Sequence, residues 1–224
     1  NDILINIVVW LLIIIGGLGF TVILDILQFK RFSKLSLHSK LVLTLTAIFI
    51  LVTFVFIFIL EFNNPDTLAK LDAKGKFLSA MFQAITPRTA GFNTLPLNEM
   101  TMASIFLIIV LMFIGGSPGS TAGGVKTTTA GVLILSIISV IRGRTDTEVF
   151  NRRIAKEIVD RALAVVGIGM LWVIVVTMIL SITETGHSFL QIFFEATSAF
   201  GTVGLSLGIT PELSYMGKIV ISLT

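Results

Sequence analysis

TAGFN at residues 89–93 and TVGLS at residues 202–206 occupy matching places in the two halves of this sequence. Each peptide follows a short apolar segment that begins with Phe-Leu, FLSAMFQA at 77–84 in the first case and FLQIFFEA at 189–196 in the second. The second peptide lies one residue further from its apolar segment than the first does. A match of this length predicts that one structural unit occurs twice.

The composition places the chain in a membrane. Hydrophobic residues make up 54% of the 224 positions, charged residues only 13%, and the mean hydropathy is +0.99. A helix needs roughly 20 apolar residues to cross a bilayer, and the stretches 3–24, 40–60 and 162–182 meet that requirement. The absence of cysteine excludes disulfides and thiolate metal sites. We therefore expect an all-α protein that crosses the membrane several times and is surrounded by membrane lipid.

The net charge of +3 is compatible with nucleic-acid binding, but the basic residues do not form one soluble face. They gather in two connections between apolar stretches, 28–40 and 142–161, whereas 61–76 balances acids with lysines and 181–188 has no Lys or Arg. Basic connections of membrane proteins face the cytoplasm. This distribution argues against a nucleic-acid partner and places both Thr-x-Gly peptides on the outer side of the membrane.

The apolar segments before the two peptides are too short to cross the membrane. Residues 77–86 and 189–199 would form helices of roughly 15 Å, about half of the hydrocarbon thickness. Each is expected to enter from outside and return as extended chain, which is tolerated only where the backbone is buried in protein or lines a wet cavity. That arrangement is typical of a pore helix followed by a selectivity filter.

The predicted unit consists of an outward-running helix (M1), the short re-entrant helix (P), the Thr-x-Gly peptide and a second full span (M2). Residues 1–39 are assigned to an M2, running from 3 to 29, and its cytoplasmic connection; 40–160 to a complete unit; and 161–224 to a last unit cut off inside its M2. Because the first M2 stands without its own M1 and P, we expect a fragment of a protein with at least three units. Gly16, Gly17 and Gly19 are expected to permit close helix packing.

Both Thr-x-Gly peptides are expected to bind a dehydrated cation through main-chain oxygens, as the Thr-Val-Gly core of potassium-channel filters does. Glycine lets successive carbonyls turn toward one axis, and the C-terminal ends of the P helices favour a cation there. The alternative is an ordinary turn after a helix. No organic cofactor is expected. The candidate ion-binding residues are Thr89, Ala90, Gly91, Phe92, Asn93, Thr202, Val203, Gly204, Leu205 and Ser206.

Arg88 directly precedes the first peptide, where a positive charge aimed at the axis would repel a cation. We expect its side chain to turn away and to pair with Glu99 or Glu195, or else to lie solvated in the outer vestibule.

A glycine-rich segment separates the helical stretches 100–114 and 127–141. A single helix through the whole region would be about 65 Å long, twice what the membrane needs, so we expect a break. A flexible segment of small residues can obstruct a pathway and move aside. Lys126 is expected to face the cavity or a carbonyl. The alternative is that the segment is only a helix kink. The residues of this candidate gate are Gly115, Gly116, Ser117, Pro118, Gly119, Ser120, Thr121, Ala122, Gly123, Gly124, Val125 and Lys126.

Two enzymatic interpretations of the same segment fit poorly. A phosphate-binding loop needs Gly-Lys, but Val125 separates Gly124 from Lys126. Gly115-x-Ser117-x-Gly119 fits a hydrolase nucleophile elbow, yet no strand precedes it, and His38 and His187 are expected at opposite membrane surfaces. We expect no enzyme; an intramembrane serine hydrolase using Ser117 and a non-conducting scaffold are the rival hypotheses.

TAGFN, TVGLS, GGSPGSTAGGVKTT at 115–128 and GGLGF at 16–20 together resemble the Trk/Ktr/HKT superfamily of potassium transporters, most closely the membrane subunits of bacterial Ktr systems. The resemblance implies four M1-P-M2 units around a pseudo-fourfold pore in one polypeptide, with Gly91 and Gly204 as two of four filter glycines. It also implies potassium (K⁺) uptake across the bacterial inner (plasma) membrane, a gating loop at 115–126, a homodimer and a cytosolic ring of nucleotide-binding (KtrA-type) regulatory subunits. Stimulation by Na⁺ is left open.

Overall fold

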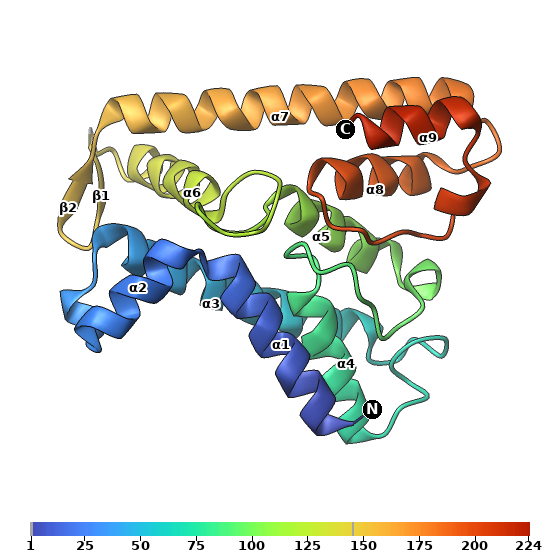
Figure 1. Cartoon of the computed structure of the whole chain (residues 1–224), viewed down its shortest axis with the longest axis horizontal. Coiled ribbons are helices and arrows are strands. Elements are labelled where there is room, and N and C mark those ends of the chain that lie inside the picture. Colours follow the sequence, from blue (N-terminus) through green and yellow to red (C-terminus); the bar gives the residue numbers. More distant parts are fainter. Residues whose placement is uncertain (1, 145) are drawn as a thin grey trace.

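The computed structural model describes residues 2–144 and 146–224, and its regular structure is mostly helical (Figure 1). The helices are α1 (Ile3–Leu18), α2 (Phe20–Phe29), α3 (Leu37–Glu61), α4 (Ala73–Ile85), α5 (Met102–Phe113), α6 (Thr127–Ile141), α7 (Lys156–Thr183), α8 (Phe189–Phe200) and α9 (Tyr215–Ser222). Short 3-10 helices lie at Phe32–Lys34, Leu97–Glu99 and Thr210–Glu212. A small antiparallel hairpin is formed by β1 (Thr147–Val149) and β2 (Arg152–Ile154).

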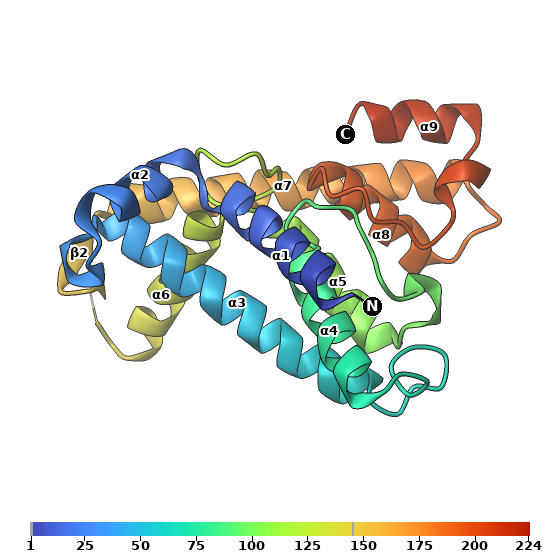
Figure 2. The same ribbon diagram turned by 60° about the horizontal axis from the view of Figure 1, so that its bottom comes forward.

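Two helices, α3 and α7, are each long and apolar enough to cross a membrane, with mean hydropathies of 2.9 and 2.7. They contain the predicted spans 40–60 and 162–182, and both begin before them. Ser36 caps the start of α3 by accepting a hydrogen bond from the Ser39 amide. Figure 2 shows the two long helices with the shorter ones packed between and beside them. Many large apolar side chains on their outer faces are exposed, as lipid contact allows.

The predicted M2 at 3–29 consists of two helices with a sharp bend between them. Helices α1 and α2 meet at Gly19 at an angle of 99°, and the bent pair passes the hydropathy test for a span only when taken together. Gly19 has a φ of +85°, and a Cβ built there would lie 2.5 Å from the carbonyl oxygen of Pro118. The Phe20 amide then donates to the carbonyl oxygen of Gly119 at 3.2 Å. The chain turns because the glycine-rich loop lies against it, a contact that an uninterrupted apolar run cannot reveal.

The short helices α4 and α8 have 13 and 12 residues, roughly 20 Å each, and neither reaches across a membrane. Each begins at a side-chain cap, Asp72 for α4 and a capping box of Ser188 with Gln191 for α8. Helix α4 packs against α1 and α3, and α8 packs against α5, α7 and α9. The predicted pair of short helices is therefore present, and α4 starts earlier than expected because of its cap.

The main hydrophobic core joins the two halves of the chain. It lies between α3, α4, α5 and α8 and includes residues of the loops that follow α4 and α8. Its buried members are Ile57, Leu68, Ala80, Leu95, Leu97, Met100, Ile105, Ile108, Ile109, Met112, Phe194, Val203, Leu205 and Leu207. Because Val203 and Leu205 belong to this core, the second Thr-x-Gly peptide is anchored in the centre of the fold.

The predicted break between 114 and 127 is also present. Helix α5 ends at Phe113 and α6 begins at Thr127. At the break, Ile114 and Val125 pair as an isolated parallel bridge, and the Val125 amide donates to the carbonyl oxygen of Phe113 at 3.0 Å. The intervening glycine-rich loop therefore leaves and returns at nearly the same point.

Candidate functional site

The two Thr-x-Gly peptides share an uncommon backbone conformation. In the first, Thr89 and Gly91 have φ values of +60° and +75°; in the second, Thr202 and Gly204 have +51° and +84°. A positive φ is rare for a β-branched residue such as threonine, and it is costly unless the surroundings enforce it. The same pair of positive φ values at matched positions indicates that both copies adopt the same loop conformation.

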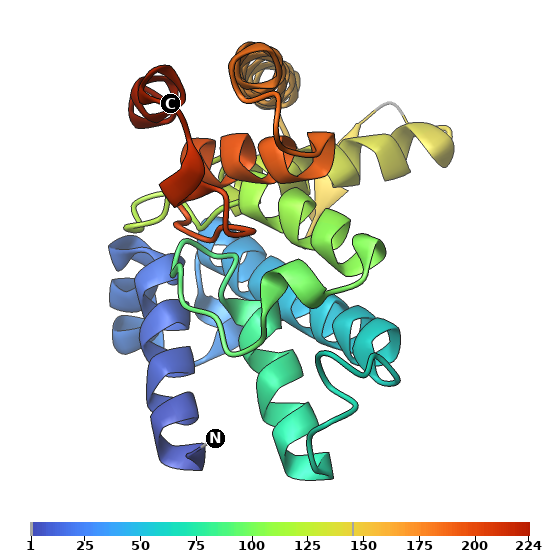
Figure 3. The same ribbon diagram turned by 90° about the vertical axis from the view of Figure 1, so that its right-hand side faces the viewer.

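The peptides also lie against each other. A Cβ built on Gly91 would be 2.7 Å from the carbonyl oxygen of Val203 and 3.5 Å from the Cα of Gly204. A Cβ built on Gly204 would be 3.7 Å from the Cα of Gly91. Figure 3 shows the loops after α4 (green) and α8 (red) next to each other at the centre of the molecule. The fold therefore brings together two glycines that are far apart in the sequence.

Several main-chain oxygens at this contact are unused. Within residues 2–144 and 146–224, the carbonyls of Thr89 to Gly91 and of Thr202 to Gly204 accept no hydrogen bond. Over the same residues there is no cluster of three or more His, Cys, Asp or Glu side chains that could hold a metal. Thr202 and Gly204 are exposed, and Thr89, Ala90 and Gly91 are half-buried, so this stretch of backbone is accessible to a ligand. Main-chain oxygens are thus the available ligands here for a cation.

A hydroxyl at the end of each short helix fixes the residue after each glycine. Thr86, which follows α4, donates to the carbonyl oxygen of Phe92, and Ser198 in α8 donates to that of Leu205 at 2.6 Å. Thr86 is fully buried and Ser198 nearly so. Sequence reasoning missed these two residues, although they occupy equivalent positions after FLSAMFQA and FLQIFFEA.

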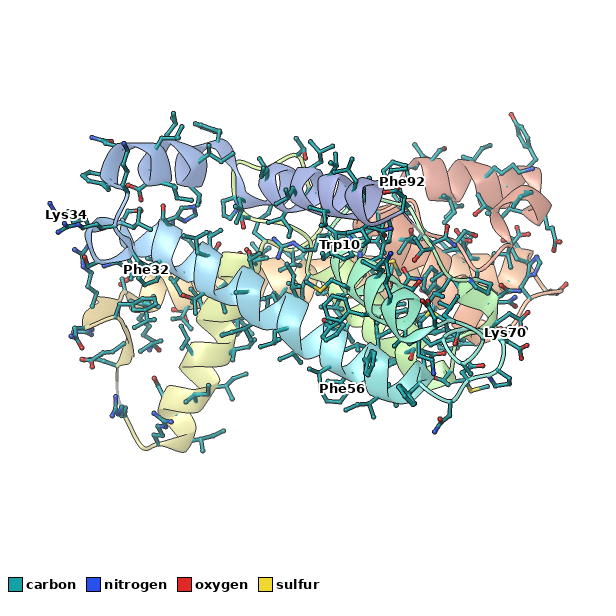
Figure 4. All side chains as sticks on the ribbon, turned by 90° about the horizontal axis from the view of Figure 1, so that it is seen from below. Trp10, Phe32, Lys34, Phe56, Lys70 and Phe92 are labelled. Carbon is teal, nitrogen blue, oxygen red and sulfur yellow. The ribbon has the colours of Figure 1, made fainter. Side chains whose placement is uncertain are left out.

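The remaining residues of the two peptides behave differently in the two copies. The Phe92 side chain is 63% exposed and lies beside α1 (Figure 4), whereas Leu205 is buried in the core. The Asn93 side chain donates to the carbonyl oxygen of Leu95 at 3.0 Å, and the Ser206 hydroxyl donates to Glu195. The matched geometry is therefore confined to the Thr-x-Gly core and the carbonyl that follows it.

The expectations for Arg88 are both wrong. Its side chain is only 6% exposed, so it is not solvated, and in the described part of the chain its guanidinium has no hydrogen-bond partner. Glu99 is exposed, and Glu195 binds the hydroxyls of Ser206 and Thr210 instead. The guanidinium packs against α1, with Nη2 3.5 Å from the position of a Cβ at Gly17. The small size of Gly17 lets α1 lie directly on this side chain.

The glycine-rich loop, residues 115–126, is a compact folded segment. The amides of Ser117 and Thr127 donate to the carbonyl oxygens of Gly17 and Gly116, each at 2.9 Å. Lys126 donates to the carbonyl oxygen of Ala122, in agreement with the prediction that it faces a carbonyl. One side of the loop therefore rests on the bend between α1 and α2.

The other side of the glycine-rich loop touches the second Thr-x-Gly peptide. A Cβ built on Gly123 would be 2.3 Å from Oγ1 of Thr202 and 2.8 Å from the carbonyl oxygen of Gly201. Only glycine allows so close an approach. The loop is thus placed next to the first residue of that peptide, at the end opposite to the loop's contact with Gly17.

A family profile described as "TrkH: Cation transport protein" matches residues 1–224. The chain belongs to the TrkH cation transport family. It is 45% identical over 221 residues to the Ktr system potassium uptake protein B of Bacillus subtilis. The aligned region covers 99% of this chain and 49% of that protein. It is 43% identical over 217 residues to the potassium/sodium uptake protein NtpJ of Enterococcus hirae, covering 96% of this chain and 48% of NtpJ. The chain spans about half the length of these curated relatives.

A solved structure has the same fold. The crystal structure of the potassium transporter TrkH from Vibrio parahaemolyticus superposes with a TM-score of 0.75 at 21% identity, covering 99% of this chain and 48% of that one. The resemblance to the Trk and Ktr transporters and the helical fold class are therefore confirmed. The named relatives of this TrkH-family chain are transporters rather than enzymes.

The hydrolase interpretation also fails on the geometry of Ser117. Its hydroxyl is fully buried and lies 3.0 Å from the hydroxyl of Thr127, and its hydrogen bonds among the described residues involve no histidine. His187 instead lies 3.9 Å from a carboxylate oxygen of Glu212. A serine without a base in contact has no means of activation. In this TrkH-family chain Ser117 holds the glycine-rich loop to the start of α6.

Proposed function

We propose that this chain forms half of a potassium-conducting pore in which the two Thr-x-Gly peptides are selectivity-filter strands. The observation that carries the proposal is the contact between Gly91 and Gly204, which places two sets of unused carbonyls at one point. A dehydrated K⁺ needs several oxygens to replace its water shell, and rings of backbone carbonyls provide them in potassium channels. The candidate ion-binding segments are residues 89–93 and 202–206, with the carbonyls of 89–91 and 202–204 as the ligands and equivalent strands of the whole protein completing the site.

Two further features favour a cation at this point. The C-terminal ends of α4 and α8 lead directly into the peptides, so the negative ends of both helix dipoles lie close to the proposed ion. The Thr86 and Ser198 hydroxyls hold the carbonyls of Phe92 and Leu205, so these two oxygens are engaged and the three preceding ones in each strand are free to face the ion.

The glycine-rich loop is the proposed gate. It lies against Thr202 at the inner end of the second filter strand and is supported by the α1–α2 bend. A segment of small residues held mainly by main-chain hydrogen bonds can change conformation at low steric cost. We propose that a cytosolic nucleotide-binding ring of the KtrA type, acting on a homodimer of the whole protein, controls its position.

The orientation and ion coupling follow from the same proposal. The basic connections 28–40 and 142–161 face the cytoplasm and the filter strands face outside, in a bacterial inner membrane. The relative NtpJ is named a potassium/sodium uptake protein, and a stimulating role for Na⁺ is proposed here on that basis.

The direct test is ion flux through the full-length protein in proteoliposomes. Rb⁺ uptake is expected to rise in proportion to the amount of protein and to be inhibited by excess K⁺. The Ser117→Ala variant serves as a check on the hydrolase alternative, because no activity should depend on a nucleophile there. Absence of protein-dependent Rb⁺ flux would contradict the transport proposal and favour the hypothesis of a non-conducting scaffold.

The buried hydroxyls of Thr86 and Ser198 give a second prediction. Thr86→Val and Ser198→Ala should each lower the K⁺ over Na⁺ flux ratio about two- to tenfold, the range expected for loss of one hydrogen bond. Thr86→Ser and Ser198→Thr keep the hydroxyl and should retain the ratio. Equal ratios in all four variants would mean that these hydrogen bonds do not shape the filter.

A further inference from the structure

Each long helix ends at a buried glutamate that binds the start of the helix after the filter. Glu61 is the last residue of α3 and is fully buried; Glu184 follows α7 and is 5% exposed. Glu61 accepts hydrogen bonds from the amide and the hydroxyl of Thr101 at 2.9 and 2.7 Å. Glu184 accepts them from the amide and the hydroxyl of Ser214 at 3.0 and 2.5 Å. In both halves of the chain, therefore, one glutamate accepts from the amide and the hydroxyl of a single residue, Glu61 through one carboxylate oxygen and Glu184 through both.

Thr101 and Ser214 are the N-cap residues of α5 and α9. Their hydroxyls also accept hydrogen bonds from the amides of Ser104 and Gly217, at 3.3 and 3.0 Å. In an ordinary capping box the residue at that third helical position is Glu or Gln, and its side chain reaches back to the N-cap amide. Here those positions hold Ser104 and Gly217, and the carboxylate comes from the neighbouring long helix.

We call each of these contacts a split capping box: Glu61 with Thr101, and Glu184 with Ser214. Helix α8 shows the ordinary form, in which Ser188 and Gln191 complete the box within one helix. The split form leaves little room, since a Cβ built on Gly217 would lie 2.4 Å from Oε1 of Glu184. Each of these helix starts is therefore capped by its own N-cap hydroxyl and is also tied to a different helix.

Hydrogen-bond donors, rather than basic side chains, hold both carboxylates. Glu61 also receives hydrogen bonds from the side chains of Asn64 and Thr67, each at 2.7 Å. Over the residues that the structure covers, neither glutamate forms an ion pair with Lys or Arg. The two hydrogen bonds from Ser214 lower the pKa of the Glu184 carboxyl. A carboxylate held by several donors at the start of a helix stabilises the positive end of the helix dipole.

The split capping boxes lie at the same sequence spacing from the proposed filter. Thr101 follows Gly91, and Ser214 follows Gly204, at the same spacing in the sequence. Each connecting segment runs through a short 3-10 helix, Leu97–Glu99 or Thr210–Glu212. The outer return of each filter strand is therefore fixed at one end by the Thr86 or Ser198 hydroxyl and at the other by the glutamate.

We propose that Glu61 and Glu184 are positioning residues for ion selectivity: each ties the outer return of one filter strand to the long helix of the same unit. This inference rests on the proposed function. If the tie is loosened, the strand can shift relative to its partner, and the carbonyl spacing that discriminates K⁺ from Na⁺ is lost.

The test uses the full-length protein in proteoliposomes, with K⁺ and Na⁺ fluxes measured on the same preparations. Thr101→Val and Ser214→Ala remove the donor hydroxyl and should lower the K⁺ over Na⁺ ratio about tenfold, because hydrogen bonds to charged groups are the stronger class. Thr101→Ser and Ser214→Thr keep the hydroxyl and should restore the ratio. Glu99→Gln, an exposed glutamate close in sequence to Thr101, is the matched control and should leave it unchanged.

A merely structural role predicts a different pattern. Thr101→Val and Ser214→Ala would then reduce the yield of folded protein and its Tm while each surviving molecule kept the wild-type flux ratio, and that result overturns the positioning role. Loss of all flux in the wild-type protein would overturn the proposed function as well, so the two failures are distinguishable. The double variant Glu61→Gln, Thr101→Val should have a K⁺ over Na⁺ flux ratio no lower than that of either single variant. If the two effects add, the two residues do not act through their mutual hydrogen bonds.

Discussion

Gly204→Ser is expected to lower the K⁺ over Na⁺ flux ratio of the full-length protein by about tenfold, equivalent to roughly 1.4 kcal/mol of lost discrimination. Gly204 has a φ of +84°, a conformation that residues with a side chain rarely adopt. A Cβ there would lie 3.7 Å from the Cα of Gly91, which is ordinary contact. The serine therefore fits in space, and its cost falls on the backbone, which should rotate and take its carbonyl away from the ion.

Gly208→Ser is the matched control for this prediction. Gly208 also has a positive φ, of +96°, and a Cβ built there would meet nothing within 4 Å. The control thus carries the same conformational strain four positions further along the chain, outside the Thr-x-Gly core. A similar fall in the flux ratio for both variants would show that strain alone is responsible and that Gly204 has no special place in the filter.

Local sequence patterns predicted the parts of the fold that depend on local causes. The apolar runs in 40–60 and 162–182 specify α3 and α7, and the repeated glycines together with Pro118 disfavour a helix after Ile114. The repeated Thr-x-Gly peptide predicted two matching loops, and both adopt the same pair of positive φ values.

The features that sequence reasoning missed all depend on contacts between distant residues. The bend at Gly19 exists because Pro118 and Gly119 lie against it, although the apolar run itself is unbroken. Arg88 is buried against α1 rather than paired with an acid, because Gly17 leaves space for it. The bonds from Thr101 to Glu61 join residues on different helices, and the local signal was misleading, since Ser104 stands where a capping box would have Glu.

Deletion of residues 116–124 is expected to raise K⁺ flux about tenfold in the absence of the cytosolic ring, an effect equivalent to roughly 1.4 kcal/mol. The deletion removes the segment that lies against Thr202, including Gly123, whose Cβ position would be 2.3 Å from the threonine hydroxyl. It should not unfold the surrounding helices, because the two ends of the segment already meet. Ile114 pairs with Val125, and the Val125 amide binds the carbonyl oxygen of Phe113 at 3.0 Å, so Gly115 can be joined directly to Val125.

The gate and the kink make opposite predictions for this variant. If the glycine-rich loop obstructs the pathway, its removal raises the flux without the ring and abolishes any further increase when the ring is added. If the loop only redirects the helix, α5 and α6 remain connected at the same point and the flux stays at the wild-type value in both conditions. Rb⁺ uptake measured with and without the ring therefore decides between them, with Tm confirming that the shortened protein is folded. The outcome depends on the loop's contact with Thr202, which is the structural reason to expect obstruction rather than simple redirection.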